Sequence, residues 1–298
     1  MMRSYYRNIL LPAGTGFHFG APIPPDLTSP RYLHAADPEE VICSVLAHAQ
    51  RGNFAPCSRL IELLKQHDDA DVWSSCSTLL SFAAPRSILL ELLPLVERMR
   101  DEHQTDAPLQ WAGETLARSC GLWSVPEVLR LFEQIQSYDR YMALPGYLSL
   151  LLEPEPDMID AGPRRRRDPS DPDWYDPPPA WEVAEYTRMV RSRYEELQGL
   201  LPYEGSCVFG GEILSLRRIA TQTITRINGP TEYSRHVESA RMLLEAHTGE
   251  VFSDFYDPDR YSLRPLHATA RLEAFLRSDT PDRFTPGVRC FFGHRIPT

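Results

Sequence analysis

The most constraining feature of this 298-residue chain is a succession of amphipathic segments with helical spacing, most of them bounded by proline or glycine. Six such segments lie between residues 37 and 135, where apolar residues recur every three or four positions. They form three helix pairs at a spacing of about 35 residues. One helix pair cannot bury its apolar face alone, so the repetition predicts an all-α chain whose αα-hairpins stack as a HEAT-like α-solenoid. A compact, non-repetitive helical bundle is the alternative.

The expected helices begin and end at recognisable signals. Asp37 followed by Pro38 is a typical start, with Asp as N-cap and proline at the first helical position. Pro94 is expected to kink the fourth helix. The helices expected in this first array are 37–52, 56–67, 71–83, 87–96, 107–119 and 126–135.

A change of composition divides the chain. Residues 153–180 hold eight prolines and eight acids without periodicity, which predicts an acidic linker or a large surface loop. We therefore expect an irregular N-terminal segment (1–37), a helical-repeat array (38–152), the linker (153–180), and a second helical section with an extended tail (181–298). Helices are expected in the last section at 181–201, 210–227, 231–248 and 262–276, with 288–292 extended or paired as a strand.

Composition excludes several classes of protein. The chain has 41 acidic and 31 basic residues, for a net charge of −10, and a mean hydropathy of −0.35. It has no apolar run long enough for a membrane helix, and acids outnumber the arginines at 164–167 two to one in the linker, which argues against nucleic-acid binding there. The six cysteines show no CxxC pair, which favours buried reduced thiols in a cytoplasmic protein.

Catalytic motifs are missing from the sequence. It contains no HExxH, GxxxxGK[ST] or GxSxG pattern, so we expect a protein that is not an enzyme and needs no cofactor or metal. A Cys290/His294 pair is conceivable, but packing of the cysteine among Phe291 and Phe292 is the favoured interpretation. The acids at 254, 257 and 259 lack the glycine and terminal glutamate of a calcium loop, which favours a solvated loop.

The placement of acids is more informative. In stacked helix pairs, turns between pairs lie on one edge and turns within pairs on the other. The within-pair turns carry Arg51 and Arg86, whereas the between-pair turns carry carboxylates that helix dipoles explain only in part. We expect these to form a ridge that binds a basic protein partner: Asp68, Asp69, Asp71, Asp101, Glu102, Asp106 and Asp139.

The closing segment GVRCFFGHRIP (287–297), together with the helix pairs and the irregular leader, resembles an immunity-protein family of bacterial polymorphic-toxin systems. The resemblance implies neutralisation of a cognate secreted toxin by direct contact, in the cytoplasm of the producing cell, with no catalytic residues. An acidic inhibitor would suit a basic nuclease. The tail residues Phe291, Phe292, Gly293, His294 and Arg295 are interpreted as structural. We expect both phenylalanines to be buried against the last helix and Gly293 to permit the turn; direct toxin contact is the alternative.

Two other functions are weighed. A helical-repeat adaptor would bind an unrelated protein or peptide, and a toxin gene beside this one would distinguish inhibition from that role. A base-removing DNA enzyme on a solenoid scaffold would need a basic concave face, which the negative charge opposes.

Overall fold

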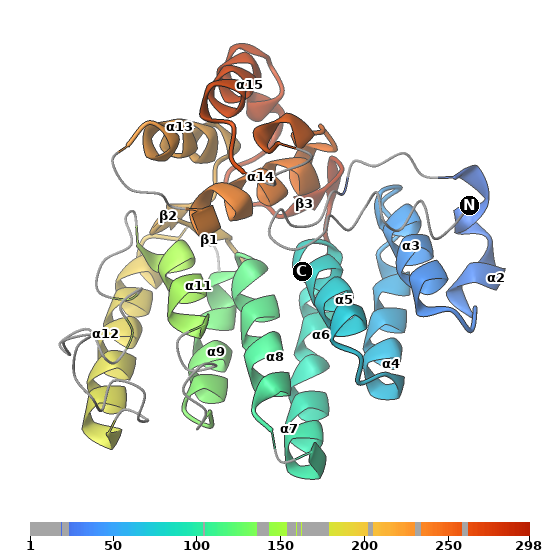
Figure 1. The fold of residues 1–298 in the computed structure, drawn as a ribbon. Coiled ribbons are helices and arrows are strands. Elements are labelled where there is room, and N and C mark those ends of the chain that lie inside the picture. The colour runs from blue at the N-terminus through green and yellow to red at the C-terminus, as the bar shows by residue number, and fades with distance from the viewer. Residues whose placement is uncertain are drawn as a thin grey trace. The chain divides into compact units, whose positions relative to one another are not determined.

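The structure, a computed structural model, describes residues 19, 24–103, 105–135, 143–153, 159, 162, 179–201, 205–229, 234–257 and 262–298. These residues are mostly helical, with four two-residue strands in two antiparallel hairpins (Figure 1), so the all-α class is confirmed. The chain forms two compact units. Unit 1 comprises Met1–Ile88 and Ser215–Thr298, and unit 2 comprises Leu89–Leu214.

Unit 1 is assembled from two separate stretches of chain. The first contains η1 (Pro25–Thr28), α2 (Pro30–Leu33), α3 (Pro38–Ala49), η2 (Ala55–Cys57), α4 (Ser58–Gln66) and α5 (Ala70–Ala83). The second contains α13 (Leu216–Ile227), α14 (Ser234–Thr248), η5 (Ser253–Phe255), α15 (Pro265–Arg277), η6 (Pro281–Arg283), β3 (Cys290–Phe291) and β4 (His294–Arg295). Helices α3, α4 and α5 pack on one another, α13 packs on α14 and α15, and α5 contacts both α14 and β3.

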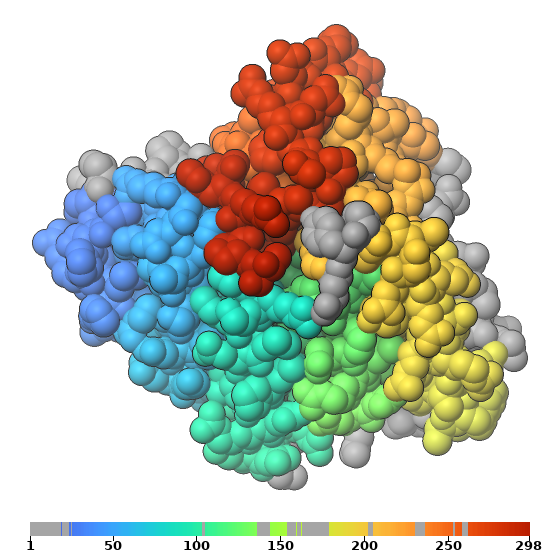
Figure 2. Space-filling view, turned by 180° about the vertical axis from the view of Figure 1, so that it is seen from behind, coloured from blue at the N-terminus to red at the C-terminus, as the bar shows by residue number. Residues whose placement is uncertain are grey.

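Unit 2 is one continuous stretch. It contains α7 (Leu92–His103), α8 (Ala107–Arg118), η3 (Leu122–Ser124), α9 (Val125–Phe132), α11 (Ala143–Leu152), α12 (Ala180–Gln198), β1 (Val208–Phe209) and β2 (Glu212–Ile213). In Figure 2 the colour of unit 2 passes from teal, at α7, through green to the yellow of α12. The boundary between the units falls within α6 (Arg86–Leu90).

Contacts in unit 2 join each helix to the next and to the next but one. Direct neighbours pack together from α7 to α12. In addition, Arg130 of α9 pairs with Glu97 of α7, Arg118 of α8 donates to the Tyr147 hydroxyl of α11 at 2.6 Å, and the rings of Phe132 (α9) and Tyr186 (α12) lie 5.1 Å apart. Helices α7, α9 and α12 therefore form one side of this unit, and α8 and α11 the other.

The expected helix starts are largely confirmed. Asp37 accepts a hydrogen bond from the Glu39 amide at 2.9 Å, and Pro38 is the first residue of α3. The expected kink is a complete break, since α6 ends at Leu90 and α7 begins at Leu92. Pro94 explains the break because its ring has no N–H to bond the Leu90 carbonyl four residues earlier.

Two segments differ from expectation. Helix α11 was not expected, because Ala143–Leu152 is almost uniformly apolar and includes a proline and a glycine. The helix expected over 210–227 begins only at Leu216, because residues 208–213 form the hairpin β1–β2. Its turn glycines, Gly210 and Gly211, have φ of 61° and 72°, which helical backbone does not allow.

The domain division also differs from expectation. Residues 153, 179 and 180, at the described ends of the expected linker, belong to unit 2, and α12 packs on α9 and α11. Of the expected second helical section, α12 and the hairpin β1–β2 belong to unit 2, and only Ser215–Thr298 joins the first helices in unit 1. Most of 153–180, including the four arginines, lies outside the described residues, as do residues 1–18 and 20–23 of the leader.

The leader residues that are described pack on the first helices. The Leu27 side chain is fully buried, and its carbonyl accepts a hydrogen bond from Ser44 of α3 at 2.7 Å. Phe19 is also buried, and its ring lies 5.0 Å from that of Phe82. Among the described helices, none combines the length and the apolar character that crossing a membrane requires.

Candidate functional site

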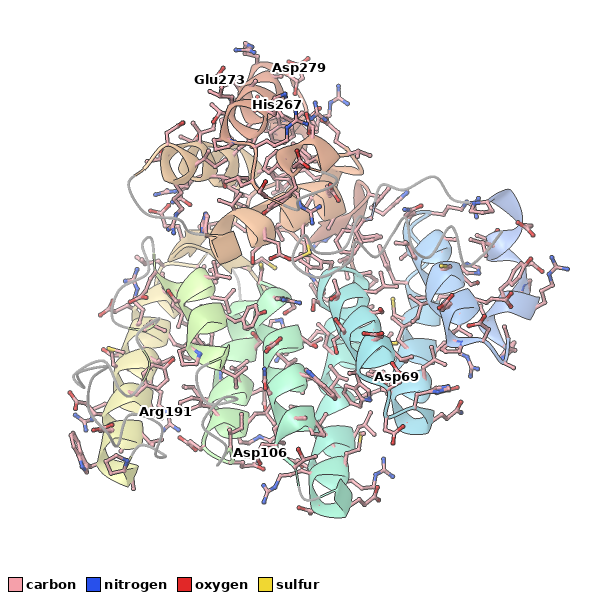
Figure 3. The ribbon with its side chains drawn as sticks, viewed as in Figure 1. Asp69, Asp106, Arg191, His267, Glu273 and Asp279 are labelled. Carbon is pink, nitrogen blue, oxygen red and sulfur yellow. The ribbon has the colours of Figure 1, made fainter. Side chains whose placement is uncertain are left out.

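The α4–α5 patch consists of three exposed carboxylates, Asp68 and Asp69 in the turn between these helices and Asp71 in the first turn of α5. Asp69, labelled in Figure 3, is the N-cap of α5 and accepts hydrogen bonds from the amides of Asp71 (2.8 Å) and Val72 (3.1 Å). The buried indole of Trp73 donates to the His67 carbonyl at 2.9 Å, which fixes the other end of the turn. The patch is therefore presented on a turn held at both ends.

Helix formation explains only part of this patch. Asp69 caps α5, and Asp71 lies in its first turn, where the helix dipole favours a negative charge. Asp68 precedes the cap, and within the described part of the chain its carboxylate has no hydrogen bond or ion pair. It is the one acid of the patch whose presence the fold does not explain.

The α7–α8 patch consists of Asp101, Glu102 and Asp106. The first two are exposed in the last turn of α7, where the dipole disfavours a carboxylate. Arg100 lies 3.8 Å from Asp101, whereas Glu102 has no partner among the described residues. Asp106, labelled in Figure 3, is the N-cap residue of α8, but its side chain forms no capping hydrogen bond.

The expected ridge thus corresponds to two patches, the α4–α5 patch on unit 1 and the α7–α8 patch on unit 2. Asp139 lies outside the described residues. Within unit 1, Arg51 precedes α4 in the chain and Asp68 follows it. Whether the two patches act together stays a prediction.

The tail is a hairpin that docks on helix ends. Phe291 is fully buried, as expected, and its ring lies 5.5 Å from that of Phe19. The amides of Phe292 and Gly293 donate to the carbonyls of Ala246 and His247 at the end of α14, at 2.6 and 2.7 Å. The hairpin's backbone amides therefore bind the C-terminus of α14, and packing of the phenylalanine rings on the last helix stays a prediction.

The turn of the tail has the expected glycine. Gly293 has φ of 78°, and Phe292 before it also has a positive φ, 49°. Phe292 is half-buried, while His294 and Arg295 are exposed on the outer strand. The structure therefore buries the Phe291 side chain fully and that of Phe292 in part, and exposes the polar side chains of His294 and Arg295.

Arg289, which sequence reasoning did not single out, is the longest-range anchor of the tail. Its guanidinium donates to the carbonyl of Ala84 at 2.7 Å and to those of Leu80 and Ser81 at the end of α5. A cation at a helix C-terminus is favoured by the dipole as well as by these bonds.

Burial dominates the chemistry of the thiols. It raises the pKa of Cys43 and Cys57 to about 12, and it also raises the pKa of Cys290. Cys290 is buried while His294 is exposed, so the thiol stays protonated and packs in the hairpin. Among the residues that the structure describes, no three metal-ligating side chains come together.

Sequence reasoning also missed a buried ion pair on α14. Arg241 and Glu245 lie 3.0 Å apart, both fully buried, and Glu245 accepts a hydrogen bond from the Phe252 amide at 2.9 Å. An i,i+4 pair of opposite charge usually marks a solvated helix face, so spacing alone does not reveal its burial. Comparisons with protein-family models, curated proteins and solved structures find no match to this chain.

Proposed function

We propose that this chain is a non-catalytic immunity protein that neutralises a cognate bacterial toxin by direct protein–protein contact. The observation that carries the proposal is the pair of exposed carboxylates Asp101 and Glu102 in the last turn of α7. Arg100 lies 3.8 Å from Asp101, whereas the Glu102 carboxylate costs roughly 0.3–1 kcal/mol against the helix dipole. A carboxylate in a place that the helix dipole disfavours is well explained by a basic binding partner.

The architecture proposed for this role is an α-solenoid. The links from α7 to α9, from α8 to α11 and from α9 to α12 support it, because stacked helix pairs join each helix to its next neighbour but one. Stacking of this kind creates extended surfaces that suit contact with another protein. The proposed location is the cytoplasm of the cell that makes the toxin.

The α7–α8 patch is the proposed contact surface, and a basic nuclease is the proposed class of toxin. The net charge of −10 supports a cationic partner, since complementary fields accelerate association. The tail is excluded from the contact in this proposal. Its phenylalanines and Arg289 have structural partners within unit 1.

The test is co-expression with the toxin domain encoded next to this chain, followed by binding kinetics of the purified pair. The chain should restore growth, and D101N/E102Q should slow association about tenfold at low salt without changing its far-UV circular dichroism. A matched control is E273Q/D279N, which removes two exposed acids, both labelled in Figure 3, from α15 and the loop that follows it.

The outcomes separate the proposal from its alternative. Failure of the chain to protect cells against any neighbouring toxin would overturn immunity, and capture of a non-toxic protein would favour a helical-repeat adaptor. Protection with equal association rates for both double variants would retain immunity but exclude the α7–α8 patch as the contact surface.

A further inference from the structure

The hairpin at the C-terminus has a counterpart inside the chain. Both hairpins place two strand residues on each side of a two-residue turn with positive φ, and their pairings are Val208 with Ile213, Phe209 with Glu212, Cys290 with Arg295, and Phe291 with His294. The sequences VFGGEIL (208–214) and CFFGHRI (290–296) share F-x-G and a final aliphatic residue. We name these segments, with the residue before each, the internal clasp (207–214) and the C-terminal clasp (289–296).

The two clasps bind a helix end in the same way. Gly210 and Gly211 donate their amides to the carbonyls of Leu150 and Leu151, both at 2.8 Å, and α11 ends at Leu152. Phe292 and Gly293 donate to Ala246 and His247, and α14 ends at Thr248. In each case two successive amides of the turn donate to the carbonyls of the two residues before the last residue of the helix. These carbonyls lack donors within their own helix.

Each clasp also reaches a second helix end. The amide of Val208 donates to the Cys120 carbonyl, just beyond the end of α8, at 2.8 Å. In the C-terminal clasp the Arg289 side chain makes the equivalent link to the end of α5. The clasped helices are neighbours in both units, since α8 packs on α11 and α5 packs on α14.

The consequence differs between the two units. Helices α8 and α11 belong to one continuous stretch of unit 2, whereas α5 and α14 come from the two separate stretches of unit 1. Cys290 and Phe291 of the inner strand and Ile296 after the outer strand are buried, whereas His294 and Arg295 of the outer strand are exposed. The C-terminal clasp therefore connects the two stretches of unit 1 and has one strand that faces solvent.

We infer that the chain contains one helix-end clasp in two copies, and that the C-terminal copy acts as a conformational latch. Closed, it holds the ends of α5 and α14 together. Released, it frees these two helix ends while unit 2 keeps its structure.

Hydrogen exchange of the full chain, followed by mass spectrometry, tests this inference. Arg289→Met removes the guanidinium that binds α5 but keeps a long side chain, and Arg295→Met, at an exposed arginine of the same hairpin, is the matched control. We expect R289M to accelerate exchange about tenfold in residues 289–296 and in the last turns of α5 and α14, with no change in unit 2. R295M should exchange like the unaltered chain.

A glycine pair provides the second arm and does not depend on R289M folding. Gly293→Ala adds a methyl group with nothing within 4 Å, so its effect comes from backbone strain at φ of 78°. Gly211→Ala strains the equivalent position of the internal clasp, at φ of 72°. Each variant should accelerate exchange about tenfold in its own clasp and at its own helix end, α14 or α11, and not in the other.

Two results would overturn the inference. One is equal exchange in R289M and R295M. The other is an acceleration by G293A that spreads evenly over both units, because the clasp would then be an ordinary part of global stability and not a local latch. If R289M does not fold, the exchange rates of G293A and G211A test the inference without it.

Discussion

Arg241 and Glu245 form an ion pair of 3.0 Å in which neither side chain is accessible to solvent. They lie one turn apart on α14, the helix that also receives the C-terminal clasp. A buried charge is stable only with its partner, because desolvation costs several kcal/mol per ion. Each charge of the pair therefore depends on the other.

Removing one charge of this pair should be costly. Glu245→Gln keeps an oxygen for the Phe252 amide but removes the negative charge that lies 3.0 Å from Arg241, and we expect a loss of about 3–5 kcal/mol in the free energy of unfolding. Glu273→Gln is the control, since Glu273 and Arg277 have the same i,i+4 spacing on α15 at 3.7 Å and are exposed. It should change stability by about 0.5 kcal/mol or less. Equal losses in urea denaturation would contradict the buried pair.

Stability of unit 1 should fall as the pH is lowered. Burial lowers the pKa of His236 to about 3 and that of His247 to about 4, whereas an unfolded histidine titrates near ~6.5. Between pH of about 6.5 and 4 these histidines are protonated in the unfolded chain but stay neutral in the folded chain. As the pH falls through this range, the free energy of unfolding decreases by up to about 1.4 kcal/mol per histidine per pH unit.

The measurement is hydrogen exchange of α14 in a pH series, corrected for intrinsic exchange rates. His247→Phe should remove one histidine's share of the slope, because a phenylalanine ring fills the site without titrating. His267→Asn, at an exposed residue of α15, serves as the control and should leave the slope unchanged. A slope that persists in a variant lacking both buried histidines would assign the effect to other groups.

The sequence predicts the helices of this chain better than their assembly. Amphipathic spacing and caps are local signals, and the structure confirms the expected Asp37 cap. Asp69 was expected near a helix C-terminus, but it is the N-cap of α5. The clasps are not local, because two-residue strands carry almost no periodicity and the donors to α14 lie more than forty residues beyond it. The link from Arg289 to Ala84 spans 205 residues, and no spacing rule reveals it. The candidate patches were found by composition, but their division between two units depends on such long-range contacts.

Replacing glycine by alanine at two helix ends should change the stability of the protein in opposite directions. Gly249, after α14, has φ of 73°, and its Cβ would come within 2.8 Å of the Phe292 ring. Gly249→Ala should therefore cost at least about 1–2 kcal/mol from the backbone, with the overlap adding to it. Gly199, after α12, has a helical φ of −66° and only ordinary contacts, so Gly199→Ala should be neutral or stabilising by up to about 1 kcal/mol. Thermal unfolding of both variants checks the contrast, and a loss of similar size at Gly199 would contradict it.

The free energy of unfolding of single variants distinguishes acids that stabilise the fold from acids that are available to bind a partner. Asp69→Ala removes the cap of α5 and should cost about 1 kcal/mol, whereas Asp69→Asn keeps a capping oxygen and should cost little. Glu102→Gln relieves an unfavourable charge at the end of α7 and should stabilise by roughly 0.3–1 kcal/mol. Chemical denaturation in low salt measures all three. A destabilising Glu102→Gln would mean that this carboxylate supports the fold, and it would remove the physical reason for assigning the α7–α8 patch to a partner.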